Sequence, residues 1–424
     1  MFSKLLKQTA TLLCSNVFAS LLNFFSVAIT LKVLGMQSFG EVTLLQSYIL
    51  VFSLCASPQA WQGLIRSLNL ESHKAALVKT TLKYELSSAF VGCVIALLFA
   101  DLYLSLLNLL EYSSSLKLAL IYIFFNQTGV AIGVLRYNEK FTELALQSVI
   151  SALIFFVCAW IGYFQGAGVE YFFMVYLGSL LVGVLYIQLC CFKHVLALYT
   201  EQGGVGNSFD KKAYRKFLYG VHLTTLADIP VKQLDNILVG ACVSVGAAGA
   251  YRVIKQIATI STKLTGPFNQ VLYPEINRLL ANQEYTKVKQ AMLKIISILM
   301  ACSITIAILT SVTSNYWIPL LFSSDLLVYQ WHLIVFLVVH AISTGFMPIH
   351  PTFLALGFIK RLLFITLSSN FILVAVIILF GPIFGLWGVL GALAIQYFMT
   401  IACKLPIVFN RLSLGTDENL TLRT

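Results

Sequence analysis

Three charged residues near the middle of the chain, Asp228, Lys232 and Asp235, have a spacing that places them on one face of a helix. The spacing is i, i+4 and i+7, and at about 100° per residue these positions project from the same side. Pro230 bends such a helix, so the alignment is approximate. Two carboxylates and an ammonium group arranged in this way can bind a charged ligand, or they can form ion pairs that fix helix packing.

A second charged group, Arg252, Lys255 and Lys263, follows in the next apolar segment. Arg252 and Lys263 fall within about 60° of each other around a helix, and Lys255 lies about 60° to one side of Arg252. The two groups together hold more cations than carboxylates, with a local charge of about +2. A diphosphate carries roughly two negative charges, so we expect these six residues to bind such an anion in a water-accessible cavity. Internal ion pairing is the alternative.

The composition places these charges inside a membrane. Hydrophobic residues make up 59% of the chain and charged residues 11%, and the mean hydropathy is +0.87. Uncharged runs such as residues 362–403 are long enough to cross the hydrocarbon layer, which requires about 20 helical residues. We predict an all-α integral membrane protein with twelve spans near residues 11–34, 41–65, 84–106, 116–137, 142–164, 171–191, 217–239, 248–272, 291–313, 328–350, 362–381 and 386–407.

The positions of the basic residues predict the topology. Nearly all of the 28 Lys and Arg residues fall on one side of the predicted stack, and Lys117 falls in an outer loop. This asymmetry predicts a multi-pass protein with both termini in the cytoplasm. The formal charge of +11 is therefore an orientation signal and indicates no nucleic-acid partner. Lys4 and Lys7 resemble the start of a signal peptide, but the apolar stretch that follows is too long, which favours a retained first helix.

An internal duplication predicts two bundles of six helices around a central cavity. Residues 34–42 and 239–251 open the second and eighth spans in the same way, and residues 62–69 have a loose echo in 273–279. Gly203, Gly204 and Gly206 lie in the longest polar stretch. We predict an N-terminal bundle over residues 1–199, a cytoplasmic linker over 200–216 and a C-terminal bundle over 217–424.

Other candidate chemistry in the chain is limited. The nine cysteines show no CxxC or metal-ligand spacing, and no GxxxxGK[ST] loop is present, so we expect no metal, no cofactor and no ATPase. His332, His340 and His350 lie in or near the tenth span, where a packing role is the main expectation and proton transfer is the alternative. Glu85 is expected near a hydrated helix end, and Lys32 is expected to reach toward the outer interface.

Four motifs resemble the polysaccharide and O-antigen flippases of the multidrug/oligosaccharidyl-lipid/polysaccharide exporter superfamily. They lie at residues 33–40 (VLGMQSFG), 233–240 (QLDNILVG), 268–279 (FNQVLYPEINRL) and 385–392 (GLWGVLGA). The resemblance covers the length of the chain. It implies a transporter that moves undecaprenyl-diphosphate-linked oligosaccharide, such as an O-antigen repeat unit of lipopolysaccharide, across the bacterial inner membrane by alternating access. It also implies ion coupling and contact with a polysaccharide polymerase and chain-length machinery as candidates.

Three rival functions are open to the sequence. A multidrug exporter shares the fold, but cationic drugs favour carboxylates in the cavity, and the first half of this chain lacks a central one. Flippases of lipid-linked peptidoglycan precursors share a cationic cavity but have more spans than the twelve predicted here. A membrane glycosyltransferase or polysaccharide polymerase acts on similar lipids, but it needs a large outer loop, and none is predicted.

Overall fold

Helices form nearly all of the described chain. The computed structural model describes residues 2–68, 73–200, 210–227, 229 and 233–421, and it does not describe the side chains at 2–10, 66, 199–200, 224, 259–271, 273–275, 277, 281, 359 and 414–421. These ranges contain no strand. The all-α class predicted from hydropathy is therefore confirmed.

Contacts between helices divide the chain into two compact units, Met1–Gly249 (unit 1) and Ala250–Thr424 (unit 2). The helices of unit 1 are α1 (Phe2–Ala56), α2 (Trp61–Leu68), α3 (Lys74–Leu106), η1 (Leu110–Tyr112), α4 (Ser113–Ala119), α5 (Ile121–Phe125), α6 (Gly129–Tyr137), α7 (Phe141–Gln165), α8 (Val169–Thr200), α9 (Lys211–Ala227) and α10 (Asp235–Cys242). Helix α11 (Val245–Ala281) begins in unit 1 and continues into unit 2.

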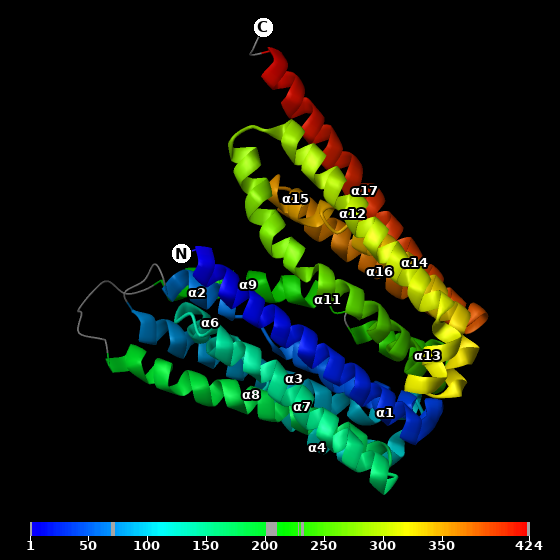
Figure 1. Cartoon of the computed structure of the whole chain (residues 1–424). Coiled ribbons are helices and arrows are strands. Elements are labelled where there is room, and N and C mark those ends of the chain that lie inside the picture. The colour runs from blue at the N-terminus through cyan, green and yellow to red at the C-terminus, as the bar shows by residue number, and fades with distance from the viewer. Residues whose placement is uncertain (1, 69–72, 201–209, 228, 230–232, 422–424) are drawn as a thin grey trace. The chain divides into compact units, whose positions relative to one another are not determined.

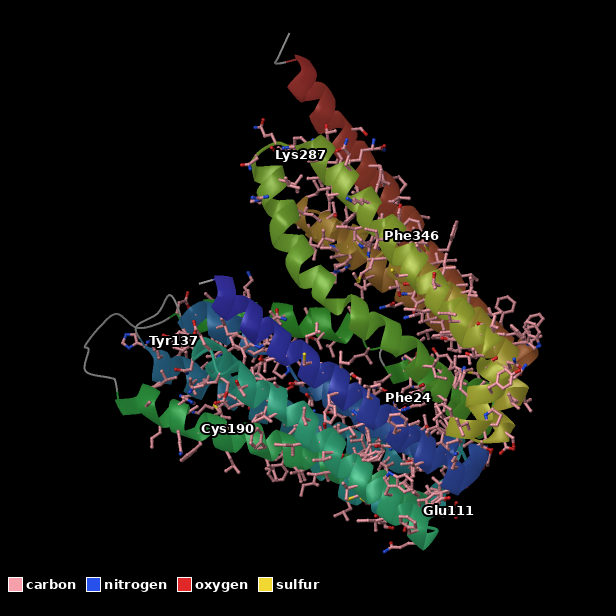
Figure 2. All side chains as sticks on the ribbon, viewed as in Figure 1. Phe24, Glu111, Tyr137, Cys190, Lys287 and Phe346 are labelled. Carbon is pink, nitrogen blue, oxygen red and sulfur yellow. The ribbon has the colours of Figure 1, made fainter. Side chains whose placement is uncertain are left out.

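Unit 2 contains the remaining helices. These are α12 (Tyr285–Val312), α13 (Ser314–Leu321), η3 (Ser324–Tyr329), α14 (Gln330–Gly345), α15 (Ile349–Ala355), α16 (Ile359–Phe384) and α17 (Leu386–Thr421). Figure 1 shows α12, α14, α16 and α17 running alongside one another within this unit. Figure 2 labels Lys287 just after the turn between α11 and α12, where its ammonium group donates to Glu284 at 2.9 Å.

The division differs from the predicted boundary between the two bundles. The sequence predicts residues 217–249 in the C-terminal bundle, but α9 contacts α1 and α2, and α10 contacts α1. These contacts bring both helices into unit 1. Residues 201–209 of the predicted linker lie outside the described ranges, so a functional boundary within 200–216 stays a prediction.

Nine segments of the described chain are long and apolar enough to cross a membrane. The first, Thr11–Ile65, contains the first two predicted spans. They are separated at Gly35, whose φ of 72° and ψ of 175° interrupt the helix. A side chain at that φ would be strained, so glycine permits the change of direction. Two further predicted spans, 217–239 and 248–272, fall on α9, α10 and α11, where part of the chain is not described.

Small residues form the buried side of α3. Ala89, Gly92, Ala96 and Ala100 recur every three or four residues and are buried. A Cβ on Gly92 would lie 2.6 Å from the Cβ of Ala56, so the two helices approach at contact distance. Large apolar side chains on the other side of α3 are exposed. Close packing of small residues with apolar side chains turned outward is typical of helices in lipid.

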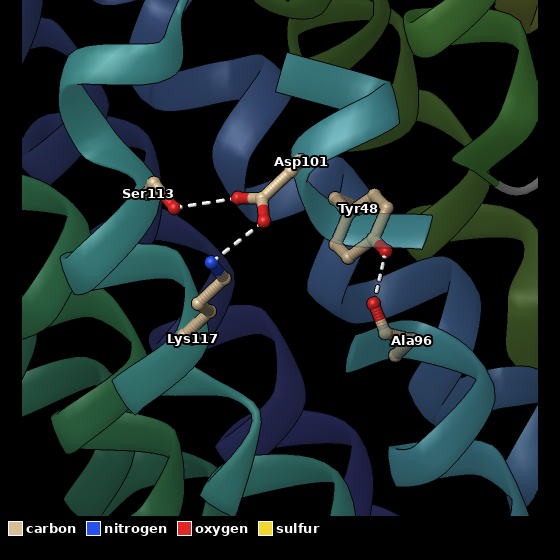
Figure 3. A network of polar contacts seen from close by, with 5 residues as sticks. All are labelled: Tyr48, Ala96, Asp101, Ser113 and Lys117. Carbon is tan, nitrogen blue, oxygen red and sulfur yellow. Dashed lines mark hydrogen bonds and ion pairs between the residues drawn. The ribbon is translucent and has the colours of Figure 1, made fainter. Parts of the chain in front are cut away.

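Lys117, the cation predicted in an outer loop, has a carboxylate partner in unit 1. Its ammonium group lies 2.7 Å from Asp101 at the end of α3, and the Ser113 hydroxyl donates to the same carboxylate at 2.6 Å (Figure 3). Nearby, the Tyr48 hydroxyl donates to the carbonyl of Ala96 and joins α1 to α3. The buried contact links the helices, whereas the exposed ion pair contributes little because water screens it.

Candidate functional site

The structure describes only part of the predicted charged site. Asp228 and Lys232 lie outside the described residues. Asp235 is the first residue of α10 and is fully buried in unit 1, and its carboxylate accepts from the Asn236 amide at 2.9 Å. A buried carboxylate held by a backbone donor is consistent with both predicted roles, ligand binding and ion pairing.

The second predicted group lies on one continuous helix. Arg252, Lys255 and Lys263 all belong to α11, and the side chain of Lys263 is not described. Over the first described turns, Val253, Ile254, Ile257 and Ala258 are buried, whereas Arg252 and Lys255 are half-buried. Over these turns the apolar residues of α11 therefore supply its buried face.

Lys255 also has an aromatic contact within its own helix. Its ammonium nitrogen lies 5.9 Å from the ring centroid of Tyr251, which is fully buried. A cation at this distance is attracted by the electron-rich face of the ring. The ring in turn packs edge-on against Phe336 of α14, with centroids 6.1 Å apart. This chain of contacts fixes the start of the charged stripe within unit 2.

Unit 2 contains a cavity that the sequence did not predict, lined by polar residues and by Phe346, Met347, Ile349 and Ile401. Its volume is about 300 Å³, and α14, α15 and α17 supply its walls. We call it the unit-2 cavity and define it by its polar lining, which consists of His340, Ser343, Thr344, His350, Gln396, Tyr397, Thr400 and Lys404. This lining contains a cation and several neutral hydrogen-bonding groups, but no carboxylate.

Several polar atoms of this lining are buried without a hydrogen-bond partner in the described chain. They are both ring nitrogens of His340, the hydroxyls of Thr344 and Thr400, and the amide oxygen of Gln396. A buried polar group that lacks a partner costs about 1–3 kcal/mol, so such groups rarely gather by chance. Together they could bind a hydroxyl-rich ligand or ordered water.

The cation and the amide of the cavity are firmly positioned. Lys404 is only 6% exposed, although it lies near the end of the last predicted span. The Gln396 amide nitrogen donates to Asn370 on α16 at 3.3 Å, which fixes the plane of the amide. The His340 ring stacks on Phe336, with centroids 5.9 Å apart. These contacts hold the imidazole and amide groups in place.

A sequence profile of the polysaccharide biosynthesis protein family matches residues 5–280 of this chain. The chain belongs to this family. No curated protein sequence matches it significantly.

Solved transporters share the fold of this polysaccharide biosynthesis protein. An inward-facing multidrug-resistance MATE family transporter of the MOP superfamily is 15% identical, with coverage of 95% of this chain and 96% of that one and a TM-score of 0.70. The lipid II flippase MurJ is also 15% identical, with coverage of 95% and 89% and a TM-score of 0.66. A MOP superfamily transporter from Pyrococcus furiosus is 16% identical, with coverage of 97% and 96% and a TM-score of 0.59. The protein is therefore a multi-pass membrane protein with the MOP transporter fold.

Glu85 of this family member lies in the interior of unit 1. The hydration expected from the sequence is wrong, because Glu85 is fully buried within the span Lys74–Leu106. One carboxylate oxygen accepts from the Val130 amide at 3.2 Å, at the start of α6. The other oxygen lies against Gly129, where an added Cβ would come within 1.9 Å of it. The carboxylate therefore occupies the positive end of α6 and stabilises that helix.

Glu85 is a buried carboxylate in the first half of the chain, where the sequence predicts no central one in a cavity. One of its oxygens is bonded at the amide end of α6, and the other has no hydrogen-bond partner in the described chain. The absence of a central carboxylate from the transport cavity stays a prediction. In the described chain, no group of three His, Cys, Asp or Glu residues gathers as a metal site would require.

Proposed function

We propose that this protein is a flippase that moves undecaprenyl-diphosphate-linked oligosaccharide from the inner to the outer leaflet of a bacterial cytoplasmic membrane. Membership in the polysaccharide biosynthesis protein family supports a substrate of this class. The shared fold of a protein described as a lipid II flippase supports a lipid-linked cargo. An O-antigen or related surface-polysaccharide repeat unit is the cargo that fits this family best.

The unit-2 cavity is the observation that carries the proposal. A sugar presents many hydroxyl groups, and each one that leaves water needs a new hydrogen-bond partner. The cavity offers imidazole, hydroxyl and amide groups whose hydrogen-bonding capacity is unfilled. Lys404 adds a positive charge and the lining adds no negative one. This set of groups suits an anionic, hydroxyl-rich head group better than a cationic drug.

The six charged residues that the sequence analysis groups together have a complementary role in this proposal. Lys263, Arg252, Lys255 and Lys232 lower the cost of carrying the diphosphate through a region of low dielectric constant. Asp235 and Asp228 keep the excess charge near +2, which limits repulsion among the cations when no cargo is bound. The lipid tail stays in the bilayer throughout, so only the head group requires this polar route.

Topology and energy supply follow from the same reasoning. We propose that both termini are cytoplasmic, because the basic residues gather on that side of the membrane. An ion gradient, the substrate gradient or consumption of the product outside the membrane supplies the energy for alternating access. A polysaccharide polymerase with its chain-length machinery would consume the product and would be a natural neighbour.

Complementation of a bacterial strain that lacks its own flippase tests this proposal. We expect Lys404→Met, Arg252→Ala and Lys263→Ala each to reduce surface polysaccharide by tenfold or more. A tenfold lower rate corresponds to an activation free energy that is higher by about 1.4 kcal/mol. The matched control is Lys287→Met, because Lys287 is an exposed lysine on α12. The amount of each variant in the membrane is measured alongside the polysaccharide.

The proposal predicts loss with the three site variants and full activity with the control. Full polysaccharide assembly by all three site variants at normal membrane levels would contradict it. Resistance to cationic drugs without any effect on surface polysaccharide would instead indicate the multidrug exporter.

A further inference from the structure

A second polar recess lies in unit 1, between α3 and α9. Its volume is about 450 Å³. Four basic residues line it, two from each helix: Lys79, Lys83, Lys211 and Arg215. We call this recess the basic groove. No Asp or Glu residue is part of its lining, so the four charges give it a positive potential.

The helical register of both elements produces the groove. The lining residues of α3 occur at positions 76, 79, 80, 83, 84 and 87, which form one face of a helix. Those of α9 occur at positions 211, 215 and 219, one turn apart. Two basic stripes therefore face one recess, and this arrangement is encoded in the sequence as repeated i, i+4 spacing.

Specific contacts hold the two stripes together. The hydroxyls of Thr81 on α3 and Tyr214 on α9 form a buried hydrogen bond of 2.6 Å. The rings of Tyr84 and Tyr219 meet edge-on, with centroids 5.0 Å apart. Burial raises the pKa of Tyr214 to about 12, so its hydroxyl stays protonated at neutral pH. The groove is consequently a built feature of unit 1 and does not result from long side chains alone.

The nearby carboxylates are directed elsewhere. Asp210 accepts from the amides of Lys212 and Ala213, which caps the start of α9. Glu85 lies next to Tyr84 in sequence, but its carboxylate is bonded at the start of α6. None of the four groove cations has an ion-pair partner in the part of the chain that is described. Like charges so close together repel one another, and a bound anion would relieve that repulsion.

We propose that the basic groove binds the diphosphate of a polyprenyl-linked cargo at the cytoplasmic surface, before the cargo moves across the membrane. This inference rests on the proposed function, since it assigns the first step of the same transport. A phospholipid head group with one phosphate neutralises at most part of the four charges. A diphosphate places about two negative charges in one group and so matches the groove better. The hydroxyls of Thr80 and Ser87 donate to carbonyls of α3, so their oxygens can accept hydrogen bonds from the first sugar, and Tyr219 adds a further hydroxyl.

The groove has a role distinct from that of the unit-2 cavity. Its four cations are exposed, so they attract phosphate over a distance comparable to the Debye length, about 10 Å at 0.1 M salt. Exposed charges bind weakly and release readily. These properties suit the capture of a head group, whereas translocation requires groups that remain effective away from water.

Binding of undecaprenyl diphosphate to the full-length protein in phosphatidylcholine bilayers tests the inference. The test variant is the double substitution Lys83→Gln with Arg215→Gln. The charge-matched control is Lys193→Gln with Lys212→Gln, because both of these cations are exposed and neither lines the groove. We expect affinity about tenfold weaker for the test variant, with a smaller salt dependence, and unchanged affinity for the control.

Two results would overturn the inference. One is equal affinity of the test variant and the control for undecaprenyl diphosphate. The other is complete displacement of the diphosphate by phosphatidylglycerol at equal concentration, which would show that the groove is a general site for anionic phospholipid head groups. A third result separates the two proposals. If the wild-type protein binds undecaprenyl diphosphate and the test variant binds it more weakly, but the wild-type protein moves no lipid-linked oligosaccharide, the proposed function is contradicted and the groove assignment stands.

Discussion

The basic groove of unit 1 and the cavity of unit 2 differ in the number and the exposure of the cations that they offer to an anionic head group. The groove presents four exposed cations and no carboxylate. The cavity contains one lysine that is 6% exposed, surrounded by neutral hydrogen-bonding groups. Water and salt screen the attraction between the groove cations and an anion, so binding there depends on the number of cations. The cavity has a single lysine and that lysine is buried, so each of its groups matters more.

Buried polar groups of the two units differ in how many of them gather at one place. In unit 1, one carboxylate oxygen of Glu85 accepts from the Val130 amide, and the other has no hydrogen-bond partner in the described chain. In unit 2, His340, Thr344, Gln396 and Thr400 all have buried polar atoms without partners in the described chain, and all four residues line one cavity. The gathered groups leave hydrogen-bonding capacity for a ligand at a cost in stability, which is typical of binding sites.

The largest expected effect is on the structural carboxylate. Glu85→Ala removes the acceptor at the start of α6 and leaves a void, so we expect a loss of about 3 kcal/mol in unfolding free energy. Glu85→Gln keeps the shape and should cost about 1 kcal/mol. Thermal unfolding of the purified protein in detergent measures both.

Transport per folded molecule separates this structural role from a binding role. We expect both Glu85 variants to transport normally once the amount of folded protein is taken into account. A stable Glu85→Gln protein that has lost transport would instead place Glu85 in the transport machinery.

The second prediction concerns the unfilled hydrogen bonds of the cavity. Thr400→Val replaces a hydroxyl that has no partner with a methyl group of similar size. We expect unfolding free energy to rise by up to about 1 kcal/mol and the transport rate to fall about tenfold. Thr352→Val is the control, because that hydroxyl is buried and already donates to the carbonyl of Pro348 at 2.8 Å. Lower stability together with unchanged transport in Thr400→Val would contradict a binding role.

The sequence predicted the fold more fully than the site. Long uncharged runs predicted the helical segments, and the structure confirms the all-α class. The unit-2 cavity was missed because His340 and Lys404 are far apart in sequence and meet only when α14 packs against α17. The spacing of Gln396, Thr400 and Lys404, each four residues apart, is the signal that could have revealed one wall.

Glu85 was missed for a related physical reason. Its partner, the Val130 amide, lies 45 residues away and carries no signal in its residue type. The basic groove, by contrast, was visible as i, i+4 charges. Because the positive-inside pattern explains cytoplasmic lysines without any ligand, those charges were assigned to topology alone.

The third prediction tests whether the affinity of the groove for a diphosphate follows the number of its cations. Lys83→Gln and Arg215→Gln should each weaken diphosphate binding about threefold. Their effects on the binding free energy should add in the double variant. Raising the salt concentration from 50 to 500 mM should weaken binding to the wild-type protein by a larger factor than binding to the double variant. A single substitution that abolishes binding, or binding that is insensitive to salt, would show that the groove acts as a specific pocket similar to the unit-2 cavity.

The smallest effect is expected at the exposed ion pair of unit 1. Lys117→Ala removes the partner of Asp101, yet water screens both groups. We expect the melting temperature and the transport rate to stay within experimental error of the wild type. A clear loss of either would show that this exposed ion pair contributes to stability or transport despite screening by water.

The central claim is that this protein moves an anionic, lipid-linked oligosaccharide between leaflets. The most direct measurement uses proteoliposomes with a fluorescent undecaprenyl-diphosphate-linked oligosaccharide and an impermeant quencher added outside. We predict that wild-type protein makes the label of both leaflets accessible to the quencher, and that Lys404→Met slows this at least tenfold relative to Lys287→Met. Wild-type vesicles in which the inner-leaflet label stays protected, as in vesicles without protein, would contradict the claim.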